Sequence, residues 1–185
     1  MSASDEVQIV QRAQAGDRDA FAALHDRYRQ AIYTYLYYRV NDRDAADDLT
    51  AEVFVRMVEK IDRYRPRGKP FIAWLYTIAR NLLTDYYRKQ GRDAENLPLE
   101  DLPLASSHNP GAEAERSLTA ECLGRAIRQL TEDQRLVIIG KFIEGRSNAE
   151  IARILEKTEG SVKSLQHRAL AALKRVIERE GCYEA

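Results

Sequence analysis

Clustered carboxylates in one predicted helix are the first candidates for chemistry. Asp47, Asp48 and Glu52 could serve in acid–base catalysis or hold a divalent cation, because both tasks need carboxylate oxygens close together. No histidine or further carboxylate joins them in the sequence, so a docking edge for another protein is the simpler interpretation. The three histidines are His25, His108 and His167. They form no Ser/His/Asp arrangement, and the sequence has no phosphate-binding glycine loop and no HExxH motif. We therefore expect a protein that is not an enzyme and needs no metal or cofactor.

A basic segment, residues 63–92, is the second candidate. It carries eight basic side chains and one acidic one, and aromatic residues lie between the cations. Cations that follow a phosphate backbone, next to aromatic rings, suit unpaired DNA bases. The alternative is a solvated basic face with the aromatic rings in the core. Phe71 fits that alternative better, whereas Trp74 fits both interpretations.

The third candidate is a helix, a short turn and a second helix within residues 147–170. A Ser147-x-x-Glu150 capping box begins the short first helix, and small Ala152 would let the two helices cross closely. The second helix, from about Glu159, could enter the major groove of DNA. A helical hairpin without a DNA role is the alternative. The outward-facing residues of the second helix are Ser161, Lys163, Ser164, Gln166, His167 and Arg168.

Helical periodicity predicts the elements that position these groups, and strand-like alternation is scarce. Ser4 is expected to cap a short first helix and Asp17 a second one. A third helix is expected over about 44–63, and a fourth over about 70–90 with Pro70 in its first turn. Further helices are expected at about 113–129 and after a Thr131-x-x-Gln134 capping box. The apolar stripe of the third helix comprises Ala45, Leu49, Val53, Met57 and Ile61, widened by Phe54 and Val58. The fourth helix is expected to bury Phe71, Leu75, Ile78 and Leu82.

The sequence therefore predicts an all-α protein with two small helical domains joined by a flexible linker. We expect a first domain over residues 1–92, a linker over 93–112 and a second domain over 113–185. The formal net charge of the 185 residues is zero, but basic and acidic segments alternate along the chain. Polyanion binding depends on such local patches. The linker is acidic and has no sustained helical period, so it could occupy a basic channel or act as a plain solvated tether.

Cellular location is predicted from what the sequence lacks. No apolar run approaches the roughly 20 residues of a membrane span, and the N-terminus has no secretion signal. We expect a cytoplasmic protein without membrane insertion. Two reduced thiols at Cys122 and Cys182 are the favoured interpretation of the two cysteines, with a redox-sensing pair as the alternative.

Four segments in order resemble the sigma-70 family of RNA polymerase sigma factors, extracytoplasmic-function (ECF) subfamily. They are DAADDLTAEVFVRM at 44–57, KPFIAWLYTIARNLLTDYYRK at 69–89, LTEDQRLVIIGKFIEGRSNAEIARI at 130–154 and GSVKSLQHRAL at 160–170. The resemblance covers nearly the whole chain. It implies sigma region 2 in the first domain and region 4 in the second. It also implies a factor that binds core RNA polymerase and directs promoter recognition and transcription initiation.

The resemblance also implies roles for particular residues. The chain would bind core polymerase at the beta-prime coiled coil and at the beta flap. The residues that dock on the coiled coil would be Asp47, Asp48, Glu52 and Arg56. The loop at 65–70 would hold a base flipped out of the minus-ten promoter element. The minus-ten candidates are Arg65, Arg67, Lys69, Trp74, Thr77, Arg80, Asn81 and Arg88. The helix from Glu159 would contact the minus-thirty-five element through its outward-facing residues given above.

Two further points follow from the resemblance. Family members often have Gly where this chain has Glu156, an apolar residue at 157, and Arg-Leu where it has Leu165-Gln166. Such factors are commonly held inactive by an anti-sigma protein, and we expect control in trans here. A helix-turn-helix regulator that works without polymerase, and a helical protein-interaction adaptor, are the alternative functions.

Overall fold

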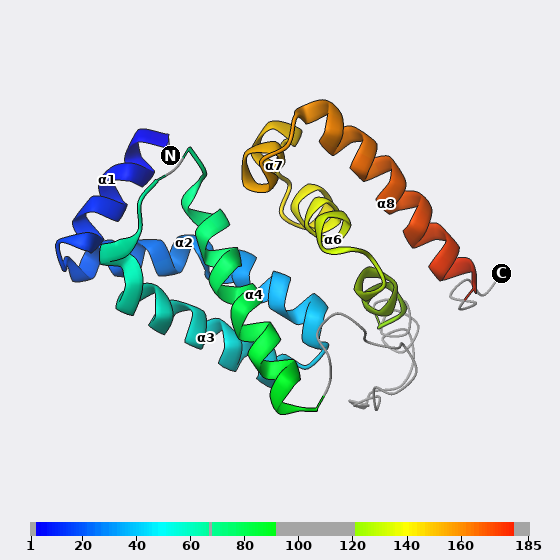
Figure 1. Ribbon diagram of the computed structural model, residues 1–185, viewed down its shortest axis with the longest axis horizontal. Helices are drawn as coiled ribbons and strands as arrows, with labels where there is room; N and C mark the ends of the chain where they lie inside the picture. The colour runs from blue at the N-terminus through cyan, green and yellow to red at the C-terminus, as the bar shows by residue number, and fades with distance from the viewer. Residues whose placement is uncertain (1–2, 67, 92–120, 180–185) are drawn as a thin grey trace, which may run out of the picture. The chain divides into compact units, whose positions relative to one another are not determined.

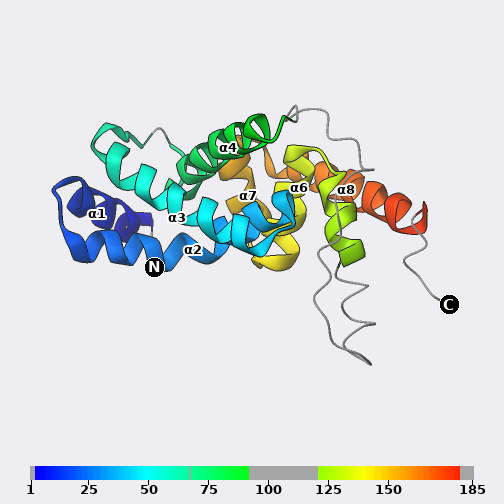
Figure 2. The same ribbon diagram turned by 90° about the horizontal axis from the view of Figure 1, so that it is seen from below.

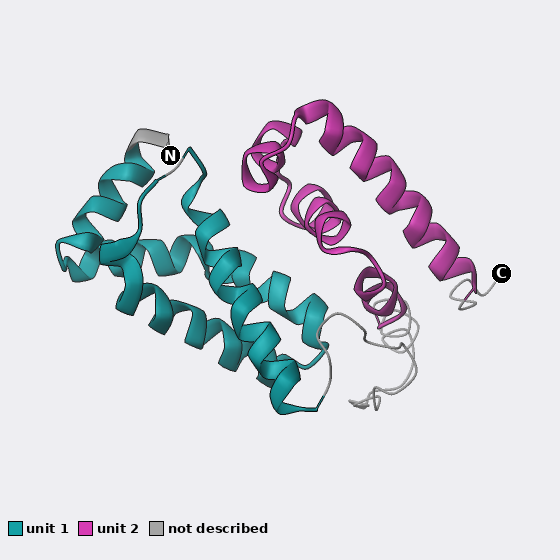
Figure 3. Ribbon diagram, in the orientation of Figure 1, with its two compact units in different colours: residues 1–97 teal, residues 98–185 magenta. Residues whose placement is uncertain are grey.

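The computed structural model describes residues 3–66, 68–91 and 121–179, and every regular element within these ranges is helical. The chain divides into two compact units, Met1–Leu97 and Pro98–Ala185, which are described separately below (Figure 3). An all-α fold with two helical units is what the sequence predicts. The predicted linker, residues 93–112, lies outside the described residues. Among the helices described, none has both the length and the apolar character that a bilayer span requires.

Unit 1 is a bundle of α1 (Ala3–Gln14), α2 (Arg18–Val40), α3 (Arg43–Lys60) and α4 (Phe71–Lys89). A short 3-10 turn, η1 (Ile61–Arg63), follows α3. The long α2 packs against α1, α3 and α4, and α3 also packs against α4 (Figures 1 and 2). The largest fully buried side chains of the unit include Tyr35, Phe71, Leu24, Ile32, Leu36 and Met57. The same four-helix bundle thereby holds both the loop after η1 and the exposed side of α4.

Side-chain caps set the helix boundaries of this unit. The Asp17 carboxylate accepts hydrogen bonds from the N–H groups of Asp19 and Ala20, which confirms the predicted cap of α2. The prediction for Ser4 is wrong, because this residue lies inside α1 rather than ahead of it. Ala3 is a strong helix former and extends the helix beyond the serine. Pro70 is the N-cap of α4 rather than part of its first turn, so the helix begins at Phe71, one residue later than expected.

The buried faces of α3 and α4 differ slightly from their predicted stripes. In α3 the buried residues are Ala46, Thr50, Val53, Phe54 and Met57. Ala45 and Leu49 are half-buried, and Val58 is 49% exposed. In α4 Phe71, Leu75 and Ile78 are buried as predicted, whereas Leu82 is half-buried and the neighbouring Leu83 is buried instead. Each helix contacts two others, and this packing sets the direction of its buried face, which periodicity alone places only to within one residue.

Unit 2 contains helical residues 121–128, then α6 (Glu132–Ile138), α7 (Asn148–Leu155) and α8 (Glu159–Arg179). A π-helical segment, η2 (Ile139–Ile143), continues α6. Both predicted capping boxes are present, Thr131 with Gln134 and Ser147 with Glu150. The long α8 packs against both α6 and α7 (Figure 1).

A buried arginine joins the helix of residues 121–128 to α6. Arg135 is 4% exposed, and its guanidinium donates to the carbonyl oxygens of Ile127, Arg128 and Leu130 at 2.7–3.2 Å. It also contacts the Glu132 carboxylate at 3.1 Å. These carbonyls end the helix of residues 121–128, where backbone acceptors lack helical partners. Arg135 therefore caps that helix from the next one.

Candidate nucleic-acid interface

The turn between α7 and α8 is built by local backbone contacts. Glu156 ends α7 in the left-handed conformation, with φ 54° and ψ 43°, and its N–H donates to the Ala152 carbonyl. The Thr158 hydroxyl then accepts from the N–H of Ser161 at 3.1 Å, as an N-cap does at the start of α8. The turn is therefore well formed with Glu156 in the left-handed position.

A small apolar cluster holds α7 and α8 against α6. It comprises Val137, Ile151, Ala152, Val162 and Leu165, with Leu155 packed against it. Ala152 is 6% exposed, which agrees with the expectation that a small residue lies where the two helices cross. Burial of Val162, Leu165 and Ala169 fixes which side of α8 is turned outward.

The outward side of α8 carries the predicted minus-thirty-five candidates. Ser161, Lys163, Ser164, His167 and Arg168 are exposed, and Gln166 is half-buried. They occupy the first ten residues of the helix, where donors to phosphates and base edges are needed. Neither cation at 163 or 168 takes part in the core of unit 2. The geometry matches a helix-turn-helix whose second helix is free to enter a major groove.

A second polar face lies along α4. Thr77, Arg80, Asn81 and Arg88 are exposed. Trp74, Thr77, Asn81 and Arg88 recur at helical spacing and thus share one side of the helix. Arg88 pairs with Asp85 at 3.0 Å, and the Thr77 hydroxyl donates to the carbonyl of Ala73.

Trp74 joins this face to the loop before α4. Its ring lies 4.9 Å from the ring of Tyr64 and 5.3 Å from that of Phe71, measured between centroids. Tyr64 and Phe71 are buried, while Trp74 is half-buried. Phe71 is therefore a core residue, as expected. Trp74 fits both the core and the DNA-contact interpretation, because part of the indole packs on the core and part remains accessible.

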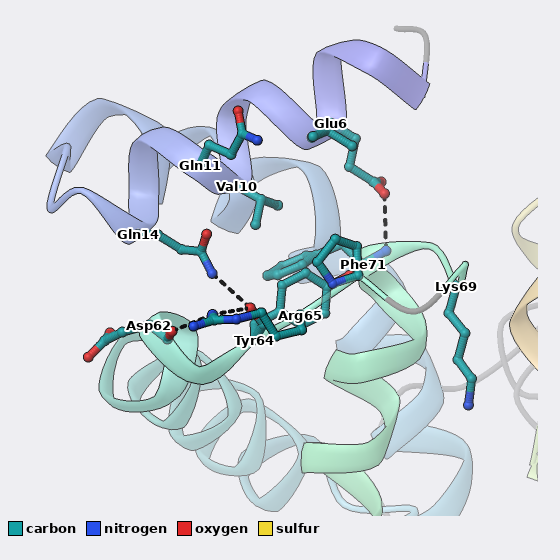
Figure 4. Close-up of a pocket in the computed structure, with 11 residues that line it drawn as sticks. Glu6, Val10, Gln11, Gln14, Asp62, Tyr64, Arg65, Lys69 and Phe71 are labelled. Carbon is teal, nitrogen blue, oxygen red and sulfur yellow. Dashed lines mark hydrogen bonds between the residues drawn. The ribbon is translucent and has the colours of Figure 1, made fainter.

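The loop that contains the other minus-ten candidates borders a pocket of about 380 Å³ (Figure 4). Arg65 and Lys69 line the pocket, whereas Arg67 lies outside the described residues. The Arg65 guanidinium donates to the carbonyls of Asp62 and Tyr64, at 2.7 and 2.9 Å. Arg65 thus shapes the loop backbone in addition to carrying charge. Five of the eleven residues that line the pocket come from α1, namely Glu6, Val7, Val10, Gln11 and Gln14.

Sequence reasoning missed Glu6 and Gln14 as residues of this region. The Glu6 carboxylate accepts from the N–H of Phe71 at 3.0 Å, and the Gln14 amide donates to the carbonyls of Ile61 and Tyr64. Neither lies in a recognisable motif, and their partners are far away in the sequence. Only the folded unit brings them together.

The candidate polymerase-docking residues lie along α3, where Asp47 is exposed and Glu52 and Arg56 are half-buried. Asp47 pairs with Arg29 of α2 at 3.1 Å, and Glu52 pairs with Arg56 at 2.8 Å. The hydrogen bond with Glu52 raises the pKa of Arg56 above its ordinary value. Asp48 is exposed. Among the described residues no three His, Cys, Asp or Glu side chains converge as metal ligands would.

The expectation of two reduced thiols is wrong for Cys122. Its side chain is 3% exposed and is disulfide-bonded. The other cysteine of the sequence, Cys182, lies outside the described residues. The expectation rested on the usual chemistry of the predicted compartment, and that argument carries no information on how the fold places a particular thiol.

Comparison with known proteins agrees with this geometry. Residues 24–93 match the family Sigma-70 region 2, and residues 120–173 match Sigma-70, region 4. The ECF RNA polymerase sigma factor BldN of Streptomyces coelicolor is 38% identical over 172 residues, which cover 92% of this chain and 65% of that protein. This chain thus spans just under two thirds of the length of BldN. SigD of Mycobacterium tuberculosis is 35% identical, with 95% of this chain and 85% of that protein covered.

Solved structures give the same picture. The structure of CnrH in complex with the cytosolic domain of CnrY has a TM-score of 0.64 and 26% identity, covering 96% of this chain and 99% of that one. The sigma factor RpoE in complex with the anti-sigma factor NepR from Bartonella quintana has the same fold, with a TM-score of 0.58, 24% identity, and coverage of 85% and 96%. This chain belongs to the ECF RNA polymerase sigma factors, which are non-catalytic subunits of RNA polymerase.

Proposed function

We propose that this chain binds core RNA polymerase in the cytoplasm and directs it to promoters. The observation that carries the proposal is the exposed polar and cationic side of α8. This side is held outward by the apolar cluster between α6, α7 and α8. In this proposal residues 1–92 act as region 2, 93–112 as a linker and 113–185 as region 4.

The proposed contacts divide among three surfaces. The side chains of α8 from Ser161 to Arg168 contact the minus-thirty-five element in the major groove. The loop at 65–70 and the exposed side of α4 bind the minus-ten element, and the pocket beside the loop takes a flipped base. Unstacking a base costs a few kcal/mol, which a pocket and an accessible indole at Trp74 would offset. The edge of α3 around Asp48 docks on the beta-prime coiled coil, while unit 2 meets the beta flap.

The promoter contacts are tested by run-off transcription with core polymerase on a genomic promoter library. Lys163→Glu and Arg168→Glu should each lower promoter use at least about tenfold, because each change removes a phosphate or base contact and adds repulsion. Lys174→Glu, at an exposed position further along α8, is the matched control. DNA binding by the free chain without promoter-specific initiation would instead favour a regulator that works without polymerase. No DNA-dependent activity at all would favour an adaptor.

An anti-sigma protein is the proposed inhibitor. CnrH and RpoE are each seen with a partner, which in the RpoE structure is named an anti-sigma factor. Both units here expose large apolar side chains, among them Val55 and Val58 on α3 and Phe142 after α6. Coexpression with neighbouring reading frames and a pull-down of the tagged chain should recover a partner that blocks binding to core polymerase. Failure of every such partner to inhibit run-off transcription would reject this part of the proposal.

A further inference from the structure

Helix α1 lies outside the residues that match Sigma-70 region 2, yet it contacts the loop that the proposed function assigns to the minus-ten element. It packs against α2 and against η1, the turn from which the loop leaves. Two of its side chains, Glu6 and Gln14, reach the two ends of that loop (Figure 4).

Gln14 holds the beginning of the loop. Its Nε2 donates to the carbonyl oxygens of Ile61 and Tyr64, both at 2.9 Å. The second of these carbonyls also accepts from Arg65. Both hydrogen bonds are partly buried, so their loss is not fully replaced by water. A single amide group therefore fixes the backbone where the chain leaves η1.

Glu6 holds the end of the loop. Pro70, the N-cap of α4, makes no side-chain capping hydrogen bond, and the N–H of Phe71 is instead bonded to Glu6 Oε1. A carboxylate at this place is also stabilised by the positive, N-terminal end of the α4 dipole. The other oxygen of Glu6 accepts from the hydroxyl of Tyr28. Burial and the neighbouring Glu6 carboxylate raise the pKa of Tyr28, so its hydroxyl stays protonated and can donate at physiological pH.

Between Gln14 and Glu6, the loop is not packed against other atoms at Gly68. Gly68 has a φ of 76°, and a Cβ built there would meet no atom within 4 Å. Fixed ends reduce the number of conformations that the loop samples. A binding loop held near its bound shape loses less entropy when it takes its ligand.

We propose that α1 positions the minus-ten loop, with Gln14 and Glu6 setting base preference and promoter opening through their hydrogen bonds to the loop backbone. This inference rests on the proposed function of the loop. It assigns to α1 a part in promoter selectivity that is separate from the DNA-facing residues of α4. Gln14 and Glu6 are positioning residues, because they act through the backbone at Tyr64 and Phe71.

The experiment uses the full chain with core polymerase and promoters randomised at the minus-ten element. Gln14→Glu keeps the shape of the side chain but removes both donors, and Gln8→Glu on the exposed side of α1 is the matched control for charge. We expect Gln14→Glu to flatten the base preference at the positions read by the loop. Opening of the preferred promoter should fall at least about fivefold, which corresponds to about 1 kcal/mol, because both hydrogen bonds from Gln14 are lost. Preference at the minus-thirty-five element should not change.

Glu6 gives the second arm. Glu6→Gln retains an oxygen that can accept from Phe71, whereas Glu6→Leu does not, so the loss of minus-ten preference should be larger for leucine. Thermal melts identify any variant whose unit 1 has unfolded, and binding to core polymerase should be unchanged in the folded ones. Variants of Gln14 and Glu6 that keep the wild-type base preference would overturn the inference. If the wild-type chain itself confers no promoter choice, the proposed function fails instead.

Discussion

The Nζ of Lys157 lies 3.1 Å from a carboxylate oxygen of Asp133, and this ion pair joins the turn of the helix-turn-helix to α6. Lys157 follows Glu156 in the turn between α7 and α8. Its side chain is 35% exposed and that of Asp133 is 45% exposed, so solvent weakens the pair. This part of the turn is therefore tied to α6 by charge at the surface.

A double-mutant cycle measures this pair. Lys157→Ala and Asp133→Ala should each lower the free energy of unfolding of unit 2, and the coupling between them should be about 0.2–1 kcal/mol. Raising the salt concentration should reduce the coupling, because exposed ion pairs are screened. Urea unfolding at low and high salt provides the measurement. A coupling of zero at low salt would show that the contact contributes nothing to the position of the turn.

Substitution of Glu156 by glycine is expected to stabilise unit 2, whereas the substitutions at the ion pair are expected to destabilise it. Its φ of 54° is a left-handed conformation that costs a residue with a Cβ about 1–2 kcal/mol. Glycine removes that cost but gains freedom in the unfolded chain, so Glu156→Gly should stabilise unit 2 by roughly 0.5–1 kcal/mol. Arg153→Gly, in the right-handed interior of α7, is the control and should destabilise the unit by about 1 kcal/mol. Chemical denaturation of the two glycine variants measures both effects. Destabilisation by Glu156→Gly would contradict the left-handed conformation of residue 156.

The helix caps of unit 2 could be predicted from the sequence, whereas the anchors of the minus-ten loop could not. Thr131 and Gln134, like Ser147 and Glu150, are three residues apart, so a local pattern determines their contact. Glu6 and Phe71 are 65 residues apart, and their contact depends on how α1 packs on the bundle. The direction of the outward side of α8 was predictable because Val162, Leu165 and Ala169 mark the opposite side. The role of Arg135 was not, because a buried arginine is identified by the carbonyls around it, which the sequence does not place.

Glu150 makes the capping box of α7 depend on pH. The N–H and the hydroxyl of Ser147 donate to its carboxylate at 2.8 and 2.7 Å, and these hydrogen bonds lower the pKa of Glu150. Because the folded pKa lies below the unfolded value of about 4.3, the stabilisation is complete above that pH. It is lost as the pH falls through the folded pKa. In urea titrations, Glu150→Gln should therefore reduce the difference in stability between pH 6 and pH 3 relative to wild type. An unchanged pH dependence would show that Glu150 does not contribute.

Trp74 should affect promoter opening more than it affects folding. Trp74→Phe keeps ring contacts with Tyr64 and Phe71 but removes part of the accessible indole surface. If a DNA base stacks there, the open complex should lose about 1 kcal/mol, or roughly fivefold in its equilibrium constant. Permanganate reactivity of unpaired thymines in the minus-ten element measures this loss. A thermal midpoint that falls in proportion to the loss of opening would instead assign Trp74 to the core alone.

Arg135 should be among the most sensitive positions of unit 2. Its guanidinium bonds three carbonyl oxygens and the Glu132 carboxylate from a site that is 4% exposed. Arg135→Lys keeps the charge but cannot reproduce the planar set of donors, so several buried acceptors lose their partners. The free energy of unfolding should fall by about 2–4 kcal/mol. Arg153→Lys, at an exposed position of α7, should change it by less than about 0.5 kcal/mol. Equal effects of the two substitutions would mean that the carbonyl oxygens of Ile127, Arg128 and Leu130 find other partners when the guanidinium is absent.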